Sequence, residues 1–293
     1  MQKQNVQQEP KPPFPRQKLK APGLEAQMKE KPRYKAPQYR AANKLENKCA
    51  LITGGDSGIG RAVAYLYARE GADVAITYLP VEKKDAQKIK SEIEALGQKC
   101  ILLEGDLTNE KFCQKAVKET VKKLGKIDIL VSNAAHQMRK DDISEITTKE
   151  FDRTFKTNVY AYFHLAKAAV PYMKPGSAII ATSSETSTRA PDQLLDYSST
   201  KGAINTFTKS LAKMLAPKGI RVNAVAPGPV WTPLNPADAG ASMEKIRNFG
   251  KKTPMERPGQ PEEMAPAYVF LASEADSSFI SGIVLPIMGG ESI

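Results

Sequence analysis

The sequence predicts one doubly wound α/β domain, in which helices cover both faces of a seven-stranded parallel sheet. Short apolar runs alternate with longer segments of helical periodicity from Lys44 onward, a rhythm typical of consecutive βαβ units. The apolar runs are continuous, as expected for strands that are buried on both faces. Because the 293-residue chain shows no internal repeat and no linker after residue 44, residues 44–293 are assigned to this single domain.

The first half predicts four strands and three helices in alternation. Gly71 and Gly97 follow the first two helical patterns directly, where glycine commonly ends a helix. The expected strands are 49–52, 73–78, 100–103 and 127–131. The expected helices are 61–70, 85–96 and 109–124.

The second half continues the pattern with three more strands and three more helices. Ile204, Phe207 and Leu211 recur at helical spacing within one of these helices. Residues 227–258 are expected to form an irregular loop, long enough to close over a substrate as a lid. The expected strands are 178–182, 220–225 and 283–287, and the expected helices are 149–173, 197–215 and 261–273.

Residues 1–43 differ from the rest in composition. They hold seven of the 21 prolines and +7 of the net charge of +11, which leaves +4 for the domain that follows. Such a segment cannot form a packed core, so we expect an extended or disordered, solvated arm. Contact with a neighbouring subunit and binding of a polyanion are the alternatives. Because the domain itself is nearly balanced in charge, no nucleic acid is expected as a partner.

The overall composition excludes several classes of protein. Hydrophobic residues make up 41% and charged residues 26%, which is ordinary globular usage. No apolar run approaches the roughly 18–20 residues of a membrane span, and the first 20 residues lack the apolar core of a secretion signal, so we expect a soluble, cytoplasmic protein without membrane contact. Three cysteines without ligand spacing and only two histidines give no reason to expect a metal site.

A glycine-rich turn stands between the first expected strand and the first expected helix. Residues 53–60 place Gly54, Gly58 and Gly60 in a Gly-x-x-x-Gly-x-Gly spacing. Glycines permit positive φ and let backbone N–H groups approach a pyrophosphate, whose charge a helix N-terminus favours. The sequence therefore indicates a dinucleotide-binding loop, with a simple tight turn as the alternative.

A second motif pairs a tyrosine with a lysine. Tyr197 and Lys201 are four residues apart and therefore lie on one face of the expected helix. An ammonium group near a phenol favours the phenolate and lowers a pKa that starts near 10, which suits proton exchange around neutral pH. Ser184 follows the strand 178–182, thirteen residues before the tyrosine. Because Tyr-x-x-x-Lys alone is common by accident, its meaning depends on the other motifs.

These motifs, taken in order, resemble those of the short-chain dehydrogenase/reductase family over 44–293. The leader 21–25 with Met28, and the Gly-Gly-Asp-Ser-Gly-Ile-Gly form of the loop, resemble the glucose and ribitol dehydrogenase-like, general-stress subgroup. Ser132 and Ala135 depart from the family pattern, where Asn and Gly are more usual. The ordered set consists of the glycine loop, Asp106, Ser132-Asn133-Ala134-Ala135, Asn158, Ser184, Tyr197-x-x-x-Lys201 and Pro227-Gly228-Pro229.

The resemblance implies a Rossmann-type fold and an NAD(P)-dependent oxidoreductase. Hydride would move between nicotinamide and a carbonyl or alcohol carbon of an aldehyde, ketone, sugar or polyol. By the same resemblance Tyr197 would be the general acid/base and Ser184 would orient the substrate oxygen. Lys201 would bind the nicotinamide ribose and lower the tyrosine pKa, and Asn158 would hold a water in a proton relay.

The resemblance also implies which residues contact cofactor. They are Gly54, Asp56, Ser57, Gly58, Ile59, Gly60, Tyr78, Asp106, Leu107, Asn133, Ala134, Ala135, Tyr197, Lys201, Pro227, Gly228, Val230 and Thr232. The substrate is expected to meet Ser184, Glu185, Tyr197 and Trp231. His136 and Gln193 are further candidates at the mouth of the site, with solvated loop positions as the alternative for both.

The choice between NAD and NADP depends on the end of the second expected strand. An acidic residue there would bind the ribose hydroxyls of NAD, but the position is the neutral Tyr78. Lys83 and Lys84 follow closely and could meet the extra phosphate of NADP, whereas Asp56 would disfavour it. The balance favours NADP, with NAD as the alternative.

Two wider interpretations concern assembly and activity. The helices around 158–173 and 197–215 carry more small and apolar residues than one sheet face needs, and family members commonly pair through them, so a homotetramer is expected. Because a fold alone does not prove function, a non-catalytic NAD(P)-binding regulatory protein remains the alternative to an enzyme. A nucleic-acid-associated protein that uses the basic arm is a second alternative.

Overall fold

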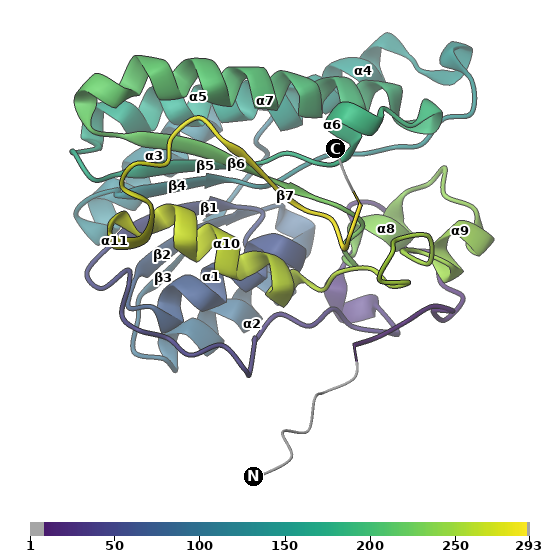
Figure 1. The fold of residues 1–293 in the computed structure, drawn as a ribbon, viewed down its shortest axis with the longest axis horizontal. Coiled ribbons are helices and arrows are strands. Elements are labelled where there is room, and N and C mark those ends of the chain that lie inside the picture. Colours follow the sequence, from purple (N-terminus) through teal and green to yellow (C-terminus); the bar gives the residue numbers. More distant parts are fainter. Residues whose placement is uncertain (1–8, 292–293) are drawn as a thin grey trace.

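The structure, a computed structural model, describes residues 9–291. Its sheet is parallel throughout, in the order β3-β2-β1-β4-β5-β6-β7 (Figure 1). The seven strands are β1 Cys49–Thr53, β2 Asp73–Tyr78, β3 Cys100–Glu104, β4 Ile129–Ser132, β5 Ala178–Thr182, β6 Arg221–Pro227 and β7 Val284–Ile287. The predicted doubly wound architecture is confirmed, with strand bounds within two residues of those expected.

Helices cover both faces of this sheet. One face carries α1 Gly58–Arg69, α2 Lys83–Glu94 and α10 Pro261–Ala272, and the other carries α3 Glu110–Leu124, α4 Thr148–Phe155, α5 Ala161–Ala169 and α7 Leu195–Leu215 (Figure 1). Shorter helices are α6 Thr186–Arg189, α8 Leu234–Ala237, α9 Met243–Arg247 and α11 Glu274–Ser277. Single 3-10 turns are Glu25–Gln27, Pro80–Glu82, Ile143–Glu145, Val170–Tyr172, Asp192–Leu194 and Ala216–Lys218.

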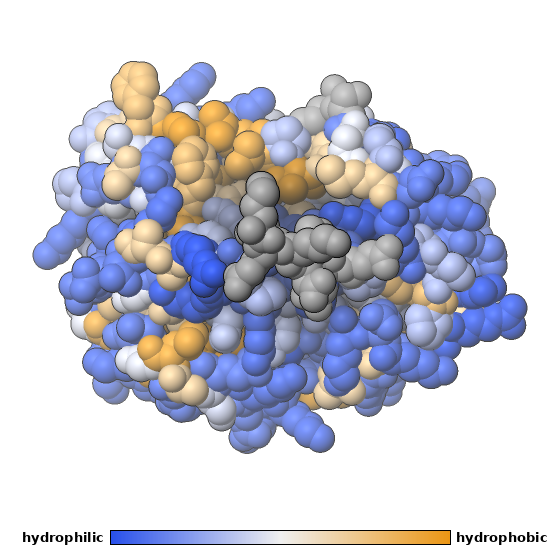
Figure 2. Space-filling view, turned by 60° about the horizontal axis from the view of Figure 1, so that its bottom comes forward, coloured by the Kyte–Doolittle hydropathy of each residue, from blue (hydrophilic) through white to orange (hydrophobic). Residues whose placement is uncertain are grey.

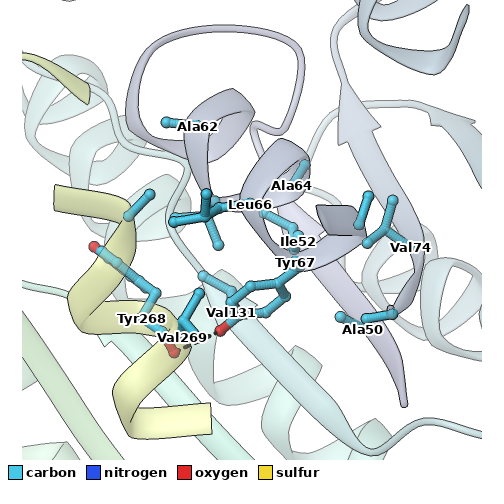
Figure 3. Close-up of a cluster of buried hydrophobic side chains, with 14 of the residues drawn as sticks. Ala50, Ile52, Ala62, Ala64, Leu66, Tyr67, Val74, Val131, Tyr268 and Val269 are labelled. Carbon is cyan, nitrogen blue, oxygen red and sulfur yellow. Dashed lines mark hydrogen bonds between the residues drawn. The ribbon is translucent and has the colours of Figure 1, made fainter. Parts of the chain in front are cut away.

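The core is divided by the sheet into two layers. On one side, small and β-branched residues of β1 and β2 pack beneath α1 and α10, where Tyr67 and Tyr268 lie fully buried (Figure 3). The Tyr67 hydroxyl donates to the backbone oxygen of Tyr268 at 3.0 Å, which satisfies a polar group that would otherwise be costly to bury. A second apolar cluster fills the space under α3, α5 and α7. The sheet therefore sits in a dry interior that fixes the positions of its loops.

Two predicted elements differ from the structure. The expected helix 149–173 is α4, a π-helical turn Lys156–Tyr160, α5 and a final 3-10 turn. Pro171 has no N–H to donate to the preceding turn, so the α-helix cannot continue through it. The stretch 227–258 is not irregular throughout, because α8 and α9 form within it.

The N-terminal arm is extended over residues 9–43, and it is only partly solvated. Its only helical turn is Glu25–Gln27, yet Phe14 and Met28 are buried against Trp231 and Ile246. The arm has too few apolar residues to form a core of its own. Apolar side chains of the loop 227–258 pack against it and complete this small cluster. Figure 1 shows the arm passing beside α8 and α9 and then along the outer side of α1 and α10. Residues 1–8 lie outside the described part.

The face drawn in Figure 2 is largely hydrophilic, with its hydrophobic residues in separate groups. Within residues 9–291 no helix is both long and apolar enough to cross a membrane. The three cysteines are all buried as free thiols.

Candidate active site

A cleft opens at the carboxyl ends of the strands, where the strand order reverses between β1 and β4. Open α/β sheets bind their ligands at this switch point because loops of opposite direction diverge there. Most residues that were predicted to bind cofactor line the cleft. They are Gly54, Asp56, Ser57, Gly58, Ile59, Tyr78, Asp106, Leu107, Asn133, Ala134, Ala135, Tyr197, Lys201 and Thr232.

The glycine loop is shaped so that a group can approach its backbone. Gly54 and Gly58 have φ of +61° and +51°, a region that side chains disfavour. A Cβ on Gly60 would collide with the carbonyl oxygen of Gly54, so this glycine packs beneath the turn and does not face the cleft. The side-chain Nδ2 of Asn133 donates to the backbone oxygen of Thr53 at 3.1 Å and ties the loop after β4 to the loop after β1. The cradle fits the pyrophosphate of a dinucleotide.

Two carboxylates stand beside this cradle. Asp56 is buried and its Oδ2 has no hydrogen-bond partner among the described residues. Burial raises the pKa of Asp56 well above its usual value, and the nearby charge of Glu82 raises it further. Burial also raises the pKa of Glu82 to about 7, although the Leu79 amide donates to its Oε2 at 2.7 Å. An unpartnered buried carboxylate is suited to accept hydrogen bonds from sugar hydroxyls.

Tyr197 and Lys201 lie at the other end of the cleft, on α7. The lysine Nζ is 5.2 Å from the centroid of the tyrosine ring and donates to the Thr182 oxygen at 2.8 Å. The two side chains therefore share one helix face, as the spacing predicted.

Burial shifts the pKa values of this pair in opposite directions. Burial raises the pKa of Tyr197 to about 12, against the lowering effects of the Ser184 hydroxyl and the Arg139 charge. Burial lowers the pKa of Lys201 to about 7. Desolvation thus drives both groups toward their neutral forms, and the lowering of the Tyr197 pKa by Lys201 stays a prediction.

Asn158 sits in the π-helical turn, a distortion that is frequent at functional sites. Its Oδ1 accepts from the His136 amide at 2.7 Å, and its Nδ2 donates to the His136 oxygen and to Thr200 Oγ1, both at 3.0 Å. Its side chain thus fixes the chain after β4 beside the cleft. The water that it was expected to hold stays a prediction.

The substrate residues are placed less uniformly. Ser184 is buried and close enough to Tyr197 to influence its pKa, whereas Glu185 lies beside it in an ion pair with Arg189. The interpretation of Trp231 as a substrate residue is wrong: it is 2% exposed, stacks on Phe14 at 4.0 Å and donates to a backbone oxygen of the arm. A single tryptophan in a long loop can either contact a ligand or be buried by another part of the chain. In this protein the N-terminal arm buries it.

The remaining predicted cofactor residues at and after the end of β6 do not line the cleft and instead hold neighbouring backbone segments together. The Gly228 amide donates to the Ile287 oxygen, the Pro227 oxygen accepts from Glu185, and Val230 is buried and bridged to Gly259. Lys83 and Lys84 are exposed at the start of α2 and do not line the cleft.

Several lining residues were missed. Glu82 lies in the 3-10 turn after β2. The acidic residue that binds ribose is expected directly at the end of that strand, so Glu82 was not considered. Arg153 and Thr157 come from α4 and the π-helical turn, and no local motif marks them. Pro22 and Gly23 belong to the arm, which sequence analysis had separated from the domain.

Comparison with known proteins agrees with this geometry. Residues 54–292 match the family described as enoyl-(acyl carrier protein) reductase. The protein titled General stress protein 39 of Bacillus subtilis (strain 168) is 52% identical over 269 residues, covering 92% of this chain and 93% of that one. This chain is a short-chain dehydrogenase/reductase. The family and the predicted subgroup are thereby confirmed.

Two plant relatives of this short-chain dehydrogenase/reductase are named for their activities. NADPH-dependent aldehyde reductase 1, chloroplastic, of Arabidopsis thaliana is 48% identical and covers 92% of this chain and 94% of its own. Glucose and ribitol dehydrogenase of Daucus carota is 46% identical, with 94% and 96% covered. The chain is an NAD(P)-dependent oxidoreductase that acts on CH–OH and C=O groups, as predicted.

Solved structures of similar short-chain dehydrogenase/reductases carry either cofactor. A short chain dehydrogenase from Burkholderia cenocepacia J2315 in complex with NADP is 34% identical, with a TM-score of 0.78 and coverage of 84% of this chain and 98% of that one. The 3-ketoacyl-(acyl-carrier-protein) reductase from Brucella melitensis complexed with NADH is 33% identical, with a TM-score of 0.76 and coverage of 85% and 100%.

Proposed function

We propose that this enzyme interconverts a small carbonyl compound and its alcohol, with Tyr197 as the general acid/base. The substrate class is an aldehyde, a ketone, a sugar or a polyol. The observation that carries the proposal is that Tyr197 and Lys201 line one end of a cleft whose other end is a dinucleotide cradle, with the Ser184 hydroxyl bonded to Tyr197. The cofactor would supply or accept the hydride, and the protein would position the reactants and move the proton.

Each of these residues has a distinct task. The Tyr197 hydroxyl, which is neutral and buried, is ready to donate its proton to a carbonyl oxygen on reduction. Ser184 adjoins that hydroxyl and orients the same oxygen. Lys201, whose pKa of about 7 lets it gain or lose a proton near neutrality, restores the proton of Tyr197 from the same helix face. Asn158 holds the loop after β4 in register with them.

The end of the cleft beside the glycine loop, where the adenosine ribose would lie and which we call the ribose end, favours NAD(H). Asp56 and Glu82 both line it. Ribose hydroxyls can hydrogen-bond to these carboxyl groups, whereas the negative charge of a phosphate would oppose their ionisation further. Lys83 and Lys84, on which the preference for NADP rested, point to solvent. These two carboxyl groups, together with the distance of both lysines from the cleft, support NAD(H) as the preferred cofactor, whereas the sequence favoured NADP.

A turnover assay tests the proposal. Purified protein is mixed with NADH or NADPH and with a panel of aldehydes, ketones, sugars and polyols, and the reduced-nicotinamide absorbance is followed. We expect turnover with several members of the panel, a lower KM for NADH than for NADPH, and loss of turnover in Tyr197→Phe. Tight cofactor binding by calorimetry without turnover of any panel member would instead establish a regulatory, non-catalytic protein.

Assembly as a homotetramer belongs to the same proposal. Tyr160, Phe163 and Met214 expose apolar surface on the outer side of α5 and α7, with Met214 71% exposed. Pairing of these helices between subunits would bury that surface. Light scattering at micromolar concentration should give a mass four times 32.0 kDa, and a monomer would contradict the proposal. A cytoplasmic location stays a prediction.

A further inference from the structure

We propose that the N-terminal arm is a working part of the cofactor site, in which Glu25 is a positioning residue for the glycine loop. The inference rests on the proposed function, because it concerns the same cleft. The arm was separated from the domain by composition, yet three of its features converge on the start of α1 and on the segment that carries Thr232.

The first feature is a direct bond to the loop. The Oε2 atom of Glu25 accepts from the Gly58 amide at 3.0 Å, at the first residue of α1. Glu25 is 3% exposed, although it comes from a segment with one helical turn and no strand among its described residues. A buried carboxylate at a helix N-terminus is favoured by the helix dipole, and Glu25 bonds the first turn of α1, to which the N-cap residue Ser57 makes no side-chain bond.

The second feature is an indirect bond through a buried arginine. The other carboxylate oxygen of Glu25 pairs with Arg61, which is 1% exposed. The Nε of this arginine donates to the Asp56 oxygen at 2.6 Å. One carboxylate from the arm therefore restrains both ends of the turn 56–58, the amide of Gly58 directly and the carbonyl of Asp56 through Arg61. The Asp56 side chain, which faces the ribose end of the cleft, is carried on that turn.

The third feature joins the arm to the opposite wall of the cleft. Gly23 lines the cleft with φ of +97°, and a Cβ there would lie 2.7 Å from the Pro233 oxygen and 2.8 Å from the Ala237 Cβ. The Leu19 amide donates to the Pro236 oxygen at 2.8 Å, next to this contact. The arm thus passes between the glycine loop and α8 and holds the two walls at a fixed separation.

The physical consequence is a loss of preorganisation when the arm contact is removed. Without Glu25, the nearest carboxylate to Arg61 is Asp85, whose Oδ1 is 3.8 Å from Nη2. A buried guanidinium that lacks its main partner shifts or admits water, and the turn 56–58 follows it. Because small misplacements of a binding loop reduce affinity strongly, we expect Glu25→Ala to weaken NADH binding on the order of tenfold, and Glu25→Gln to weaken it less.

Calorimetric titration of the full-length protein with NADH tests the inference. The variants are Glu25→Ala, Glu25→Gln and Gly23→Ala, and each is also measured for Tm and for hydrogen exchange of the amides of residues 56–60. Tyr39→Phe is the matched control, because it removes an arm contact at the far end of the same helix, where the Tyr39 hydroxyl bonds Glu70. We expect weaker binding and faster exchange in the first three variants, with both unchanged in the control.

The outcomes separate this inference from the proposed function. If the unmodified protein binds neither NADH nor NADPH, the proposed function fails and the inference falls with it. If the unmodified protein binds and the Glu25 and Gly23 variants bind equally well, the arm has no part in the site although the function stands. If the affinity for NADH falls in proportion to Tm in every variant, the control included, Glu25 contributes only to the stability of the fold and does not position the glycine loop. Should Glu25→Ala fail to fold, the other two variants decide.

Discussion

The two ends of the cleft are built in different ways. The end formed by the loops after β1 and β2 is shaped by backbone, with Gly54 and Gly58 at positive φ and two carboxylates beside them. The end formed by β5 and α7 depends on side chains, and burial moves the pKa of Tyr197 up and that of Lys201 down, away from each other. The shape of the cofactor-binding loop is therefore determined by nearby glycines. The pKa values of Tyr197 and Lys201 are instead determined by the segments that bury them.

The largest expected effect lies at the side-chain end. Tyr197→Phe removes the proton donor without changing the volume of the side chain, so kcat should fall about 10²–10⁴-fold while the affinity for NADH stays the same. Tyr162→Phe is the matched control, since this buried tyrosine on α5 bonds Thr208 and lies outside the cleft. Steady-state kinetics and calorimetry measure both quantities. An equal loss in the two variants would show that stability, not proton transfer, was affected.

The second effect lies at the backbone end and concerns the choice of cofactor. Asp56→Asn removes a buried carboxyl group that can bond ribose hydroxyls and that repels a phosphate when it is ionised, so the ratio of the NADPH to the NADH dissociation constant should fall about tenfold. Asp106→Asn serves as the control, because this residue lines the cleft but is exposed to solvent. If Asp56→Asn leaves the ratio unchanged, the carboxylates do not select the cofactor.

The same contrast explains what sequence could predict. The alternation of strands and helices, the glycine loop and the shared face of Tyr197 and Lys201 follow from spacing along the chain, because a helix or a strand fixes the relative position of its own residues. The protonation of the pair could not be predicted, since it depends on burial by segments far apart in the chain.

The arm and Trp231 show the other limit. Arm composition favours a solvated chain, and a tryptophan in a long loop suggests binding, yet the two bury each other through the Phe14 stack. The arm and the loop 227–258 each supply the apolar partner that the other lacks. The burial of either one could therefore not be predicted from its own sequence. Glu82 was missed for a related reason, because a 3-10 turn returns it to the cleft after the strand has ended.

A third effect tests the charge of the ribose end through stability. In the folded chain the Glu82 carboxyl keeps its proton up to a pKa of about 7, compared with 4.5 when unfolded, so this group makes the protein less stable as the pH rises from about 4.5 to 7. Glu82→Gln should therefore raise the free energy of unfolding by about 1–2 kcal/mol at pH 8, after allowance for partial exposure, and by little at pH 4.

Urea unfolding at the two pH values measures this difference. Glu104→Gln is the control, because Glu104 is an exposed carboxylate at the end of the neighbouring strand and accepts from Tyr78. A gain at pH 8 that persists at pH 4 would mean that the substitution improves packing and does not relieve a desolvated charge.

The smallest effect is expected from the two lysines that first suggested NADP. Lys83 and Lys84 are exposed on the first turn of α2, where each is hydrated and screened by salt. Replacing both with alanine should change the affinity for NADPH less than twofold, because neither ammonium group faces the carboxylate-lined pocket. Calorimetry at low and at physiological salt is the measurement. A tenfold loss at low salt would mean that the lysines reach a bound phosphate, and the backbone end of the cleft would then carry a cation as well as its two carboxylates.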